Sequence, residues 1–250
     1  MKTIVKPLLS ALMMLVVLAG CMVLTGSARP LTRLEGNVTL MPMGDSITGS
    51  TGHWRCLLWT QLRDAGYHVN FLGERTGHVR KCDVPGFDDD NNGYSGMKVT
   101  KLAKDHRAKH WMLREHRRVD IVLLHLGSND FRHGKELPEI MRGFDGVLKQ
   151  IRSVNPRATV LVAQPIPMGT RPMYKSCPRC PEQIKSLDDA IPQWVEKNNN
   201  LKSPVIDVDQ TRGFDVAADT TDELHPTDAT GNPKIARRWF NALKGVLDQE

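Results

Sequence analysis

Aromatic residues are scarce in this sequence: phenylalanine, tyrosine and tryptophan together make up 6% of its 250 residues. The basic stretch from Lys104 to Arg118 accordingly lacks the aromatic interleaving that is typical of RNA-binding surfaces. We interpret this stretch as the solvated face of a helix and expect no nucleic-acid partner. The formal net charge of +6 is moderate, although a positive field can also favour an anionic polymer such as an acidic polysaccharide.

Long apolar runs are also rare, and the main one covers residues 8–24. It is short for a membrane span, and a glycine interrupts it. Basic residues precede it and small residues follow it up to Ala28, as in a secretory signal peptide. We therefore predict a signal peptide over residues 1–28 and one exported domain over residues 29–250. The tetrapeptide ending at Cys21 also resembles a bacterial lipobox, in which a lipid on Cys21 would hold the protein at the cell envelope. The apolar residues after Cys21 argue against that alternative.

Cysteine occurs five times, and the CxxC motif Cys177–Cys180 has no second copy. Four cysteines remain if Cys21 leaves with the signal, and an even count in an exported protein favours disulfides. A bond between Cys177 and Cys180 would close a small local ring and leave Cys56 to pair with Cys82. A redox-active pair or half of a zinc site is the alternative reading of the CxxC motif.

A complete metal-binding motif is missing as well. Asp88, Asp90, Asn92 and Gly93 match the opening of a calcium-binding EF-hand loop, but Val99 occupies the position of the closing glutamate. We expect neither a metal nor an organic cofactor, with calcium at Asp88–Asn92 as the alternative.

No internal repeat, low-complexity tract or interdomain linker divides the chain, and about 220 residues suffice for one α/β domain with a substantial core. Strand-like and helix-like segments alternate along it. The predicted strands are Val38–Met43, Val69–Leu72, Val119–Leu126, Thr159–Ala163 and Val205–Val208. The apolar spacing predicts helices over Trp54–Leu62, Val99–Glu115, Leu137–Ile151, Leu187–Val195 and Ile235–Val246. This alternation predicts a flavodoxin-like, doubly wound parallel sheet of five strands with helices on both faces.

Polar groups follow the predicted strands. Ser46 comes directly after the first strand, Gly96 lies in the loop after the second, Asn129 follows the third, and Asp222 and His225 follow the fifth. In doubly wound sheets, functional sites form where the carboxyl ends of the strands meet. We therefore expect these five residues to lie together at one edge of the sheet.

These residue types supply the parts that acyl transfer requires. A serine hydroxyl becomes a nucleophile when a base removes its proton, and His225 can serve as the base for Ser46. Asp222, three residues earlier, can fix the tautomer of the imidazole and stabilise its cation. The backbone N–H groups of Ser46 and Gly96 and the side-chain amide of Asn129 can donate to the oxyanion of the tetrahedral intermediate.

Several polar residues have structural interpretations instead. Ser46 alone would be an ordinary helix N-cap residue. We expect His125 to be a core histidine and Asp130 to be structural. Asp207 and Asp209 are rival carboxylates near the fifth strand, but the aspartate of the last block is closer in sequence to the histidine.

The four blocks GDS, YSG, GSND and DELH, in this order, resemble the SGNH hydrolases, also called GDSL esterases and lipases. In that family a serine, a glycine, an asparagine and a DxxH pair are the functional residues. The resemblance places these roles on Ser46, Gly96, Asn129, Asp222 and His225. It covers nearly all of the chain after the signal, and it implies an SGNH hydrolase fold.

A narrower resemblance is to secreted fungal and bacterial esterases near carbohydrate esterase family three, the acetylxylan esterase group. It rests on the segments GDSIT, WRCLLW, DDDNNGYSG, HLGSND, LVAQPIPM, CPRC, IPQW and DELHPTDATGNPKIARRW. Relatives often carry glutamate and histidine where this chain has Asn92 and Tyr94. This departure lies in the loop that holds Gly96, and it bears on substrate preference more than on catalysis.

The resemblance implies a secreted, monomeric serine esterase that removes short acyl groups, above all acetyl, from a plant cell-wall polysaccharide such as xylan, or from a small ester. It implies no membrane contact unless a lipid is attached at Cys21. A lysophospholipase, lipase or thioesterase on the same scaffold is one alternative, which the polar loops Thr76–Asn92 and Gly169–Gln183 disfavour. A non-catalytic carbohydrate-binding module is another, which the presence of every expected site residue disfavours.

Overall fold

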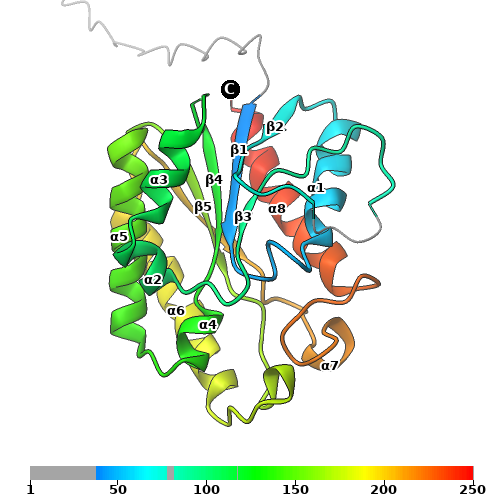
Figure 1. Cartoon of the computed structure of the whole chain (residues 1–250), viewed down its shortest axis with the longest axis vertical. Coiled ribbons are helices and arrows are strands. Elements are labelled where there is room, and N and C mark those ends of the chain that lie inside the picture. Colours follow the sequence, from blue (N-terminus) through cyan, green and yellow to red (C-terminus); the bar gives the residue numbers. More distant parts are fainter. Residues whose placement is uncertain (1–37, 78–81, 117, 250) are drawn as a thin grey trace, which may run out of the picture.

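The computed structural model describes residues 38–77, 82–116 and 118–249. The predicted signal peptide and Cys21 lie outside these residues. The described chain forms a parallel sheet in the order β2-β1-β4-β5-β6, and the two-residue strand β3 pairs with β1 beyond the end of β2 (Figure 1). The strands are β1 (Val38–Gly44), β2 (Val69–Phe71), β3 (Asn92–Gly93), β4 (Ile121–His125), β5 (Thr159–Gln164) and β6 (Val205–Asp209).

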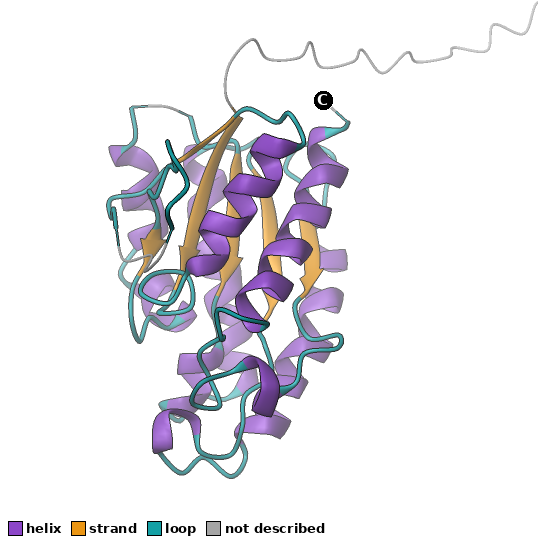
Figure 2. Ribbon diagram, turned by 90° about the vertical axis from the view of Figure 1, so that its right-hand side faces the viewer, coloured by secondary structure: helices purple, strands orange, loops and turns teal. Residues whose placement is uncertain are grey.

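Helices cover both faces of the sheet (Figures 1 and 2). On one face, α1 packs against α8, and the rings of Trp54 and Trp239 lie 6.0 Å apart between them. On the other face, α2, α3 and α6 pack against α5. These helices are α1 (His53–Asp64), α2 (Val99–Lys104), α3 (Arg107–Arg114), α5 (Leu137–Val154), α6 (Cys180–Asn198) and α8 (Gly231–Leu247). The predicted doubly wound α/β fold with five main strands is therefore confirmed.

The central strands explain why the sheet forms where the sequence predicts it. Every residue of β4 is buried, and so is β5 after its first residue, because helices cover both faces and leave no side for polar residues. In the register of β1 against β4, Leu40 faces Ile121 and Gly44 faces His125. Because these strands end at the same level, the segments that follow them emerge side by side at the carboxyl edge.

One predicted helix is interrupted. The structure divides the predicted helix Val99–Glu115 into α2 and α3 at His106, whose φ of 52° lies in the left-handed region. The buried residues show the reason, because they recur at helical spacing up to Leu102 and resume only at Ala108. A continuous helix would turn the second set away from the core, so the chain changes direction between them.

Several short elements lie at the carboxyl edge, where the sequence indicates loops. They are α4 (Ser128–Arg132), the 3₁₀-helix η1 (Pro172–Tyr174) and α7 (Val216–Asp219), at the lower end of the molecule in Figure 1. Helix α6 also begins earlier than predicted, at Cys180 rather than at Leu187. Among the described helices, none combines the length and the apolar character that crossing a bilayer requires.

Candidate active site

Ser46 lies two residues beyond the end of β1. Its backbone oxygen accepts the N–H of Thr51 at 3.0 Å, and the carbonyl of Asp45 accepts the N–H of Gly49 at 2.9 Å, so the chain coils directly after the strand. The Ser46 side chain is mostly buried, and its Oγ lies 2.9 Å from Nε2 of His225. A serine near the start of the described chain and a histidine near its end are therefore in hydrogen-bond contact.

Asp222 holds His225 through both of its carboxylate oxygens. Oδ2 lies 2.8 Å from the ring Nδ1, and Oδ1 accepts the backbone N–H of His225 at 2.8 Å. Burial acts to raise the pKa of Asp222, but the hydrogen bonds and the charge of His225 outweigh it, so this pKa lies below its ordinary value. An ionised carboxylate only accepts hydrogen bonds, so Nδ1 carries the proton and Nε2 faces Ser46 as an acceptor.

Asn129 and Gly96 lie on two neighbouring turns at the same edge. Asn129 is the second residue of α4, which follows β4 through Gly127, a glycine with a φ of 118°. Gly96 has a φ of 73° and is the third residue of a turn closed by the bond from the N–H of Met97 to the carbonyl of Tyr94. A type II turn requires such a residue at its third position, which favours glycine there.

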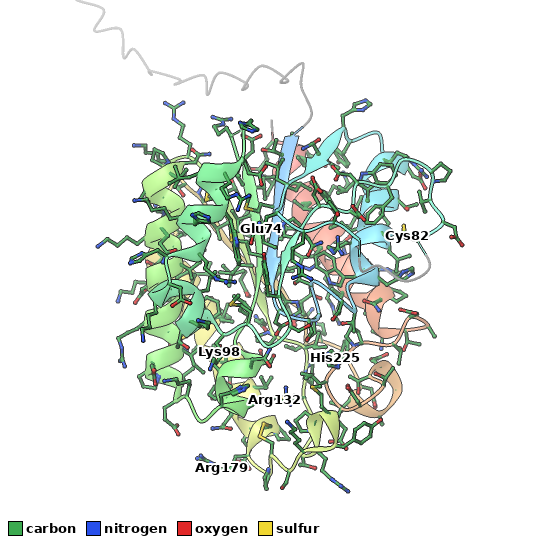
Figure 3. All side chains as sticks on the ribbon, in the orientation of Figure 1. Glu74, Cys82, Lys98, Arg132, Arg179 and His225 are labelled. Atoms are coloured by element: carbon green, nitrogen blue, oxygen red, sulfur yellow. A yellow bond between two sulfur atoms is a disulfide. The ribbon has the colours of Figure 1, made fainter. Side chains whose placement is uncertain are left out.

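Two cavities meet at His225. The first, of about 480 Å³, brings together Ser46, Gly96, Asn129 and His225, and its other lining residues are Ser50, Thr51, Ser95, Arg132, His133, Met173 and Lys175. The second, of about 440 Å³, is lined by Ser50, Thr51, His53, Thr221, His225, Pro226 and Asp228. Figure 3 shows His225 and Arg132 at the same end of the molecule. The structure thus assembles all five predicted site residues, while their catalytic roles stay predictions.

Asp45 is a buried residue of this site to which the sequence analysis gave no role. Its Oδ2 accepts the Asn129 amide at 2.8 Å, and its Oδ1 accepts the N–H of Ile47 at 2.9 Å. Burial raises its pKa to about 6 in spite of these bonds. Through its hydrogen bond to Nδ2, Asp45 orients the amide of Asn129. Its place between Gly44 and Ser46 in the GDS block was the available signal.

Asp130 and His125 have structural roles, as the sequence predicts. Asp130 is fully buried, and its carboxylate accepts the N–H of Val99 at 2.8 Å and both the N–H and the hydroxyl of Thr100, at 3.1 and 2.7 Å. It thus caps the start of α2. His125 is 2% exposed in the core beside Trp239, and burial lowers its pKa to about 4.

The rival carboxylates at the end of β6 have other partners. Asp207 accepts the side-chain amide of Gln164 at 2.7 Å. Asp209 accepts the backbone N–H groups of Thr211 and Arg212, at 2.8 and 3.0 Å. Among the described residues, the ring of His225 has hydrogen bonds to Ser46 and Asp222 and has none to Asp207 or Asp209.

The aspartate-rich loop supports the fold through hydrogen bonds. Asp88 accepts the backbone N–H of Phe71 at 2.7 Å, and the carbonyl of Asp89 accepts the buried guanidinium of Arg55 at 2.7 Å. No three histidine, cysteine or acidic residues of the described chain form a group that could hold a metal ion. This loop starts after a disulfide between Cys82 and Cys56 (Figure 3), and the second disulfide joins Cys177 to Cys180.

The two positions that depart from the family pattern are not among the residues that line the two cavities. The Oδ1 of Asn92 accepts the N–H of Glu74 at 3.2 Å. Tyr94 donates its hydroxyl to the carboxylate of Glu74 and stacks on Trp111, with the ring centres 5.4 Å apart. These contacts hold the loop that carries Gly96 in place.

Comparisons with known proteins agree with this architecture. The model of the GDSL-like lipase/acylhydrolase family matches residues 43–230. The chain is 25% identical to a multidomain esterase of Ruminococcus flavefaciens. The alignment is 246 residues long and covers 88% of this chain and 30% of that protein. The chain therefore spans about a third of the length of this curated relative.

Solved structures of esterases are similar over almost their whole length. A carbohydrate esterase of family 3 from Talaromyces cellulolyticus is 30% identical, with a TM-score of 0.75, covering 85% of this chain and 99% of that one. An acetyl esterase variant solved with an acetate ion is also 30% identical, with a TM-score of 0.74, covering 84% of this chain and 98% of that one. The family match spans most of the described domain and includes Ser46, Asn129 and His225. The chain therefore belongs to the GDSL-like lipase/acylhydrolase family of ester hydrolases.

Proposed function

We propose that this protein is a serine esterase in which Ser46 attacks the carbonyl carbon of an ester. The observation that carries the proposal is the hydrogen-bonded series from Ser46 through His225 to Asp222, with distances of 2.9 and 2.8 Å. His225 takes the proton of the serine as Oγ bonds to the carbonyl carbon, and it then gives this proton to the departing alcohol. Water activated by the same imidazole releases the acid from the acyl-enzyme.

The oxyanion formed in each step needs hydrogen-bond donors aimed at it. Within the described residues, no hydrogen bond engages the backbone N–H of Ser46 or of Gly96. The Nδ2 of Asn129 carries two hydrogens, and Asp45 takes one of them at 2.8 Å. The second hydrogen is therefore available to the oxyanion, as are the two backbone groups.

The preferred acyl group in this proposal is short, with acetyl as the first choice. The two cavities at His225 are lined mainly by hydroxyl, amide and charged side chains, and Met173 is the only large apolar side chain among the described lining residues. A long acyl chain needs a continuous apolar groove to leave water. Among the described lining residues, no run of aliphatic or aromatic side chains forms such a groove, which supports a short acyl group on a polar alcohol and disfavours a lipase or lysophospholipase.

The proposed substrate is an acetylated cell-wall polysaccharide such as xylan. Support comes from the similarity to a carbohydrate esterase of family 3 and to an acetyl esterase. Export to the cell exterior forms part of the proposal, because two disulfides are typical of exported proteins. Lipid attachment at Cys21 is the alternative form of export.

Kinetics on a series of p-nitrophenyl esters and on acetylated xylan tests the proposal. We expect hydrolysis of the acetyl ester, falling kcat/KM as the acyl chain lengthens, and loss of all but a small residual activity in Ser46→Ala. Labelling by an organophosphate should add its mass to the wild-type chain and not to the variant. A Ser46→Ala variant as active as wild type would refute the mechanism, and a strong preference for long chains would refute the substrate.

A further inference from the structure

The cavity in front of Ser46 carries uncompensated positive charge. Arg132 and Lys175 line it, His133 lies beside them, and none of the described lining residues is an aspartate or a glutamate. The second cavity differs, because Asp228 lines it. Figure 3 shows that Lys98 and Arg179 lie at the same end of the molecule as Arg132, and Arg179 is 3.8 Å from the carboxylate of Glu136.

The two lining cations lack the carboxylate partners that several other basic residues have. Elsewhere on the surface, Lys101, Lys135 and Lys185 each pair with an acidic residue four positions later. Within the described chain, the side chain of Lys175 has no ion pair or hydrogen bond, and the guanidinium of Arg132 bonds only to the side-chain oxygen of Asn129, at 3.3 Å. Such cations are free to bind an anion.

The structure anchors the backbone that carries each cation near Ser46. Arg132 is one hydrogen bond away from Asn129, a donor of the proposed oxyanion hole. Lys175 follows Met173, whose N–H donates to the carbonyl of Asp222 at 2.8 Å. The loop that carries Lys175 is therefore attached to the turn that holds His225.

We propose that this cavity binds the carboxylate of a uronic acid residue, so that the substrate is an acetylated polysaccharide with acidic sugars. This inference rests on the proposed esterase function. A guanidinium matches a carboxylate in a bidentate geometry, and a lysine adds a second charge. A volume of about 480 Å³ lies within the range of small-molecule sites and is sufficient for a sugar ring.

The occupant follows from the chemistry of the lining. An apolar acyl chain in this cavity would remove Arg132 and Lys175 from water without giving them a partner, which is unfavourable. A neutral sugar would use the hydroxyl groups of Ser50, Thr51 and Ser95 but would leave the charges unpaired. A carboxylate on the sugar satisfies both sets of groups.

Acetate release from an acetylated oligogalacturonide and from its methyl-esterified form tests the proposal, because methylation removes the charge and keeps the acetyl ester. We expect wild type to prefer the acidic form at least about fivefold in kcat/KM, through a lower KM, and this preference to fall as sodium chloride is raised. In Lys175→Met the preference should fall at least about twofold, and Arg132→Met with Lys175→Met should remove it.

Lys149→Met is the matched control, because Lys149 is an exposed lysine of α5 outside both cavities. It should keep the preference of wild type. Equal use of the two forms by wild type, or a preference in Lys175→Met that is as large as that of wild type, would overturn the proposal. Hydrolysis of p-nitrophenyl acetate without acetate release from either oligosaccharide would overturn it and leave the esterase mechanism standing. Absence of all three activities would refute the proposed function itself.

Discussion

Replacing Asp45 by asparagine is predicted to lower activity and to make the stability of the protein depend less on pH. Asp45 accepts two hydrogen bonds in the buried site, from the Asn129 amide at 2.8 Å and from the N–H of Ile47 at 2.9 Å. An asparagine at this position has one oxygen and one NH₂ group, so it accepts only one of these bonds in place. Its NH₂ group then faces another donor, and the Asn129 amide loses its orientation.

The expected kinetic effect follows from the proposed role of Asn129 as an oxyanion donor. Complete loss of one such donor costs about 100- to 1000-fold in kcat. Because Asp45→Asn misorients the donor and does not remove it, we expect kcat for p-nitrophenyl acetate to fall roughly 10- to 100-fold. The KM should change little, since the bond to the oxygen strengthens in the transition state.

The stability effect follows from the pKa of Asp45, which burial raises from 3.8 to about 6. The unfolded chain releases this proton near pH 4, while the folded chain keeps it up to about pH 6. The folded state binds more protons in this window, so its free energy of unfolding falls as the pH rises through it. A pKa difference of about two corresponds to about 3 kcal/mol of unfolding free energy. The asparagine variant does not titrate, so it does not lose this stability as the pH rises.

Urea unfolding of wild type and Asp45→Asn at pH 4 and pH 8 isolates this term. From pH 4 to pH 8, the free energy of unfolding of the variant should rise relative to that of wild type by about 1–3 kcal/mol. The exposed Asp64, paired with Arg63, provides the control substitution Asp64→Asn, which should leave kcat and the pH dependence unchanged. Unchanged kcat in Asp45→Asn, or an equal stability difference at both pH values, would refute this account of Asp45.

Three further substitutions test other parts of the site and its support. Asp222→Asn should lower kcat roughly 100- to 10,000-fold with little change in KM, as measured by ester kinetics, because the tautomer of His225 is no longer fixed; wild-type kcat would exclude that role. Asp130→Ala should lower the free energy of unfolding by about 2–4 kcal/mol in urea, because it leaves the buried start of α2 uncapped, and a loss below about 0.5 kcal/mol would contradict this. Burial and the charge of neighbouring aspartates raise the pKa of Asp188 to about 8, so its ionisation lowers stability as the pH rises from about 4 to 8. Asp188→Asn should therefore melt at a higher temperature than wild type at pH 9 and show no such advantage at pH 4.

The sheet could be predicted well because burial on both faces leaves a simple pattern. Val119–Leu126 contains β4 and Thr159–Ala163 gives β5 to within a residue, since runs of leucine and β-branched residues suit a doubly covered strand. The break at His106 was missed, although the apolar spacing skips a turn there. The two-residue strand β3 has no such pattern, because Asn92 and Gly93 pair with β1 through their backbone.

The site residues on the turns after strands could be predicted because their order along the chain fixes their edge of the sheet. Asp45 was given no role, because nothing in the sequence shows that its carboxylate bonds to the amide of Asn129, 84 positions away. Arg132 and Lys175 were missed for the same reason. A lone basic residue in a loop gives no sign that it borders a cavity.

The turn that holds Asp222 and His225 also explains why Lys175 lies near the site. Glu223, in the left-handed region at a φ of 60°, accepts the N–H of Gly169 on its carbonyl at 3.0 Å and the N–H of Arg171 on its carboxylate at 2.8 Å. These bonds fix the segment that leads to Lys175, and its far end is closed by the disulfide of the CPRC motif. The turn that places the imidazole against Ser46 is therefore also bonded to the segment that carries Lys175. In the proposed mechanism, activation of the nucleophile and recognition of the substrate would both depend on this turn. The contacts that create this dependence span about fifty residues, so spacing along the chain could not reveal it.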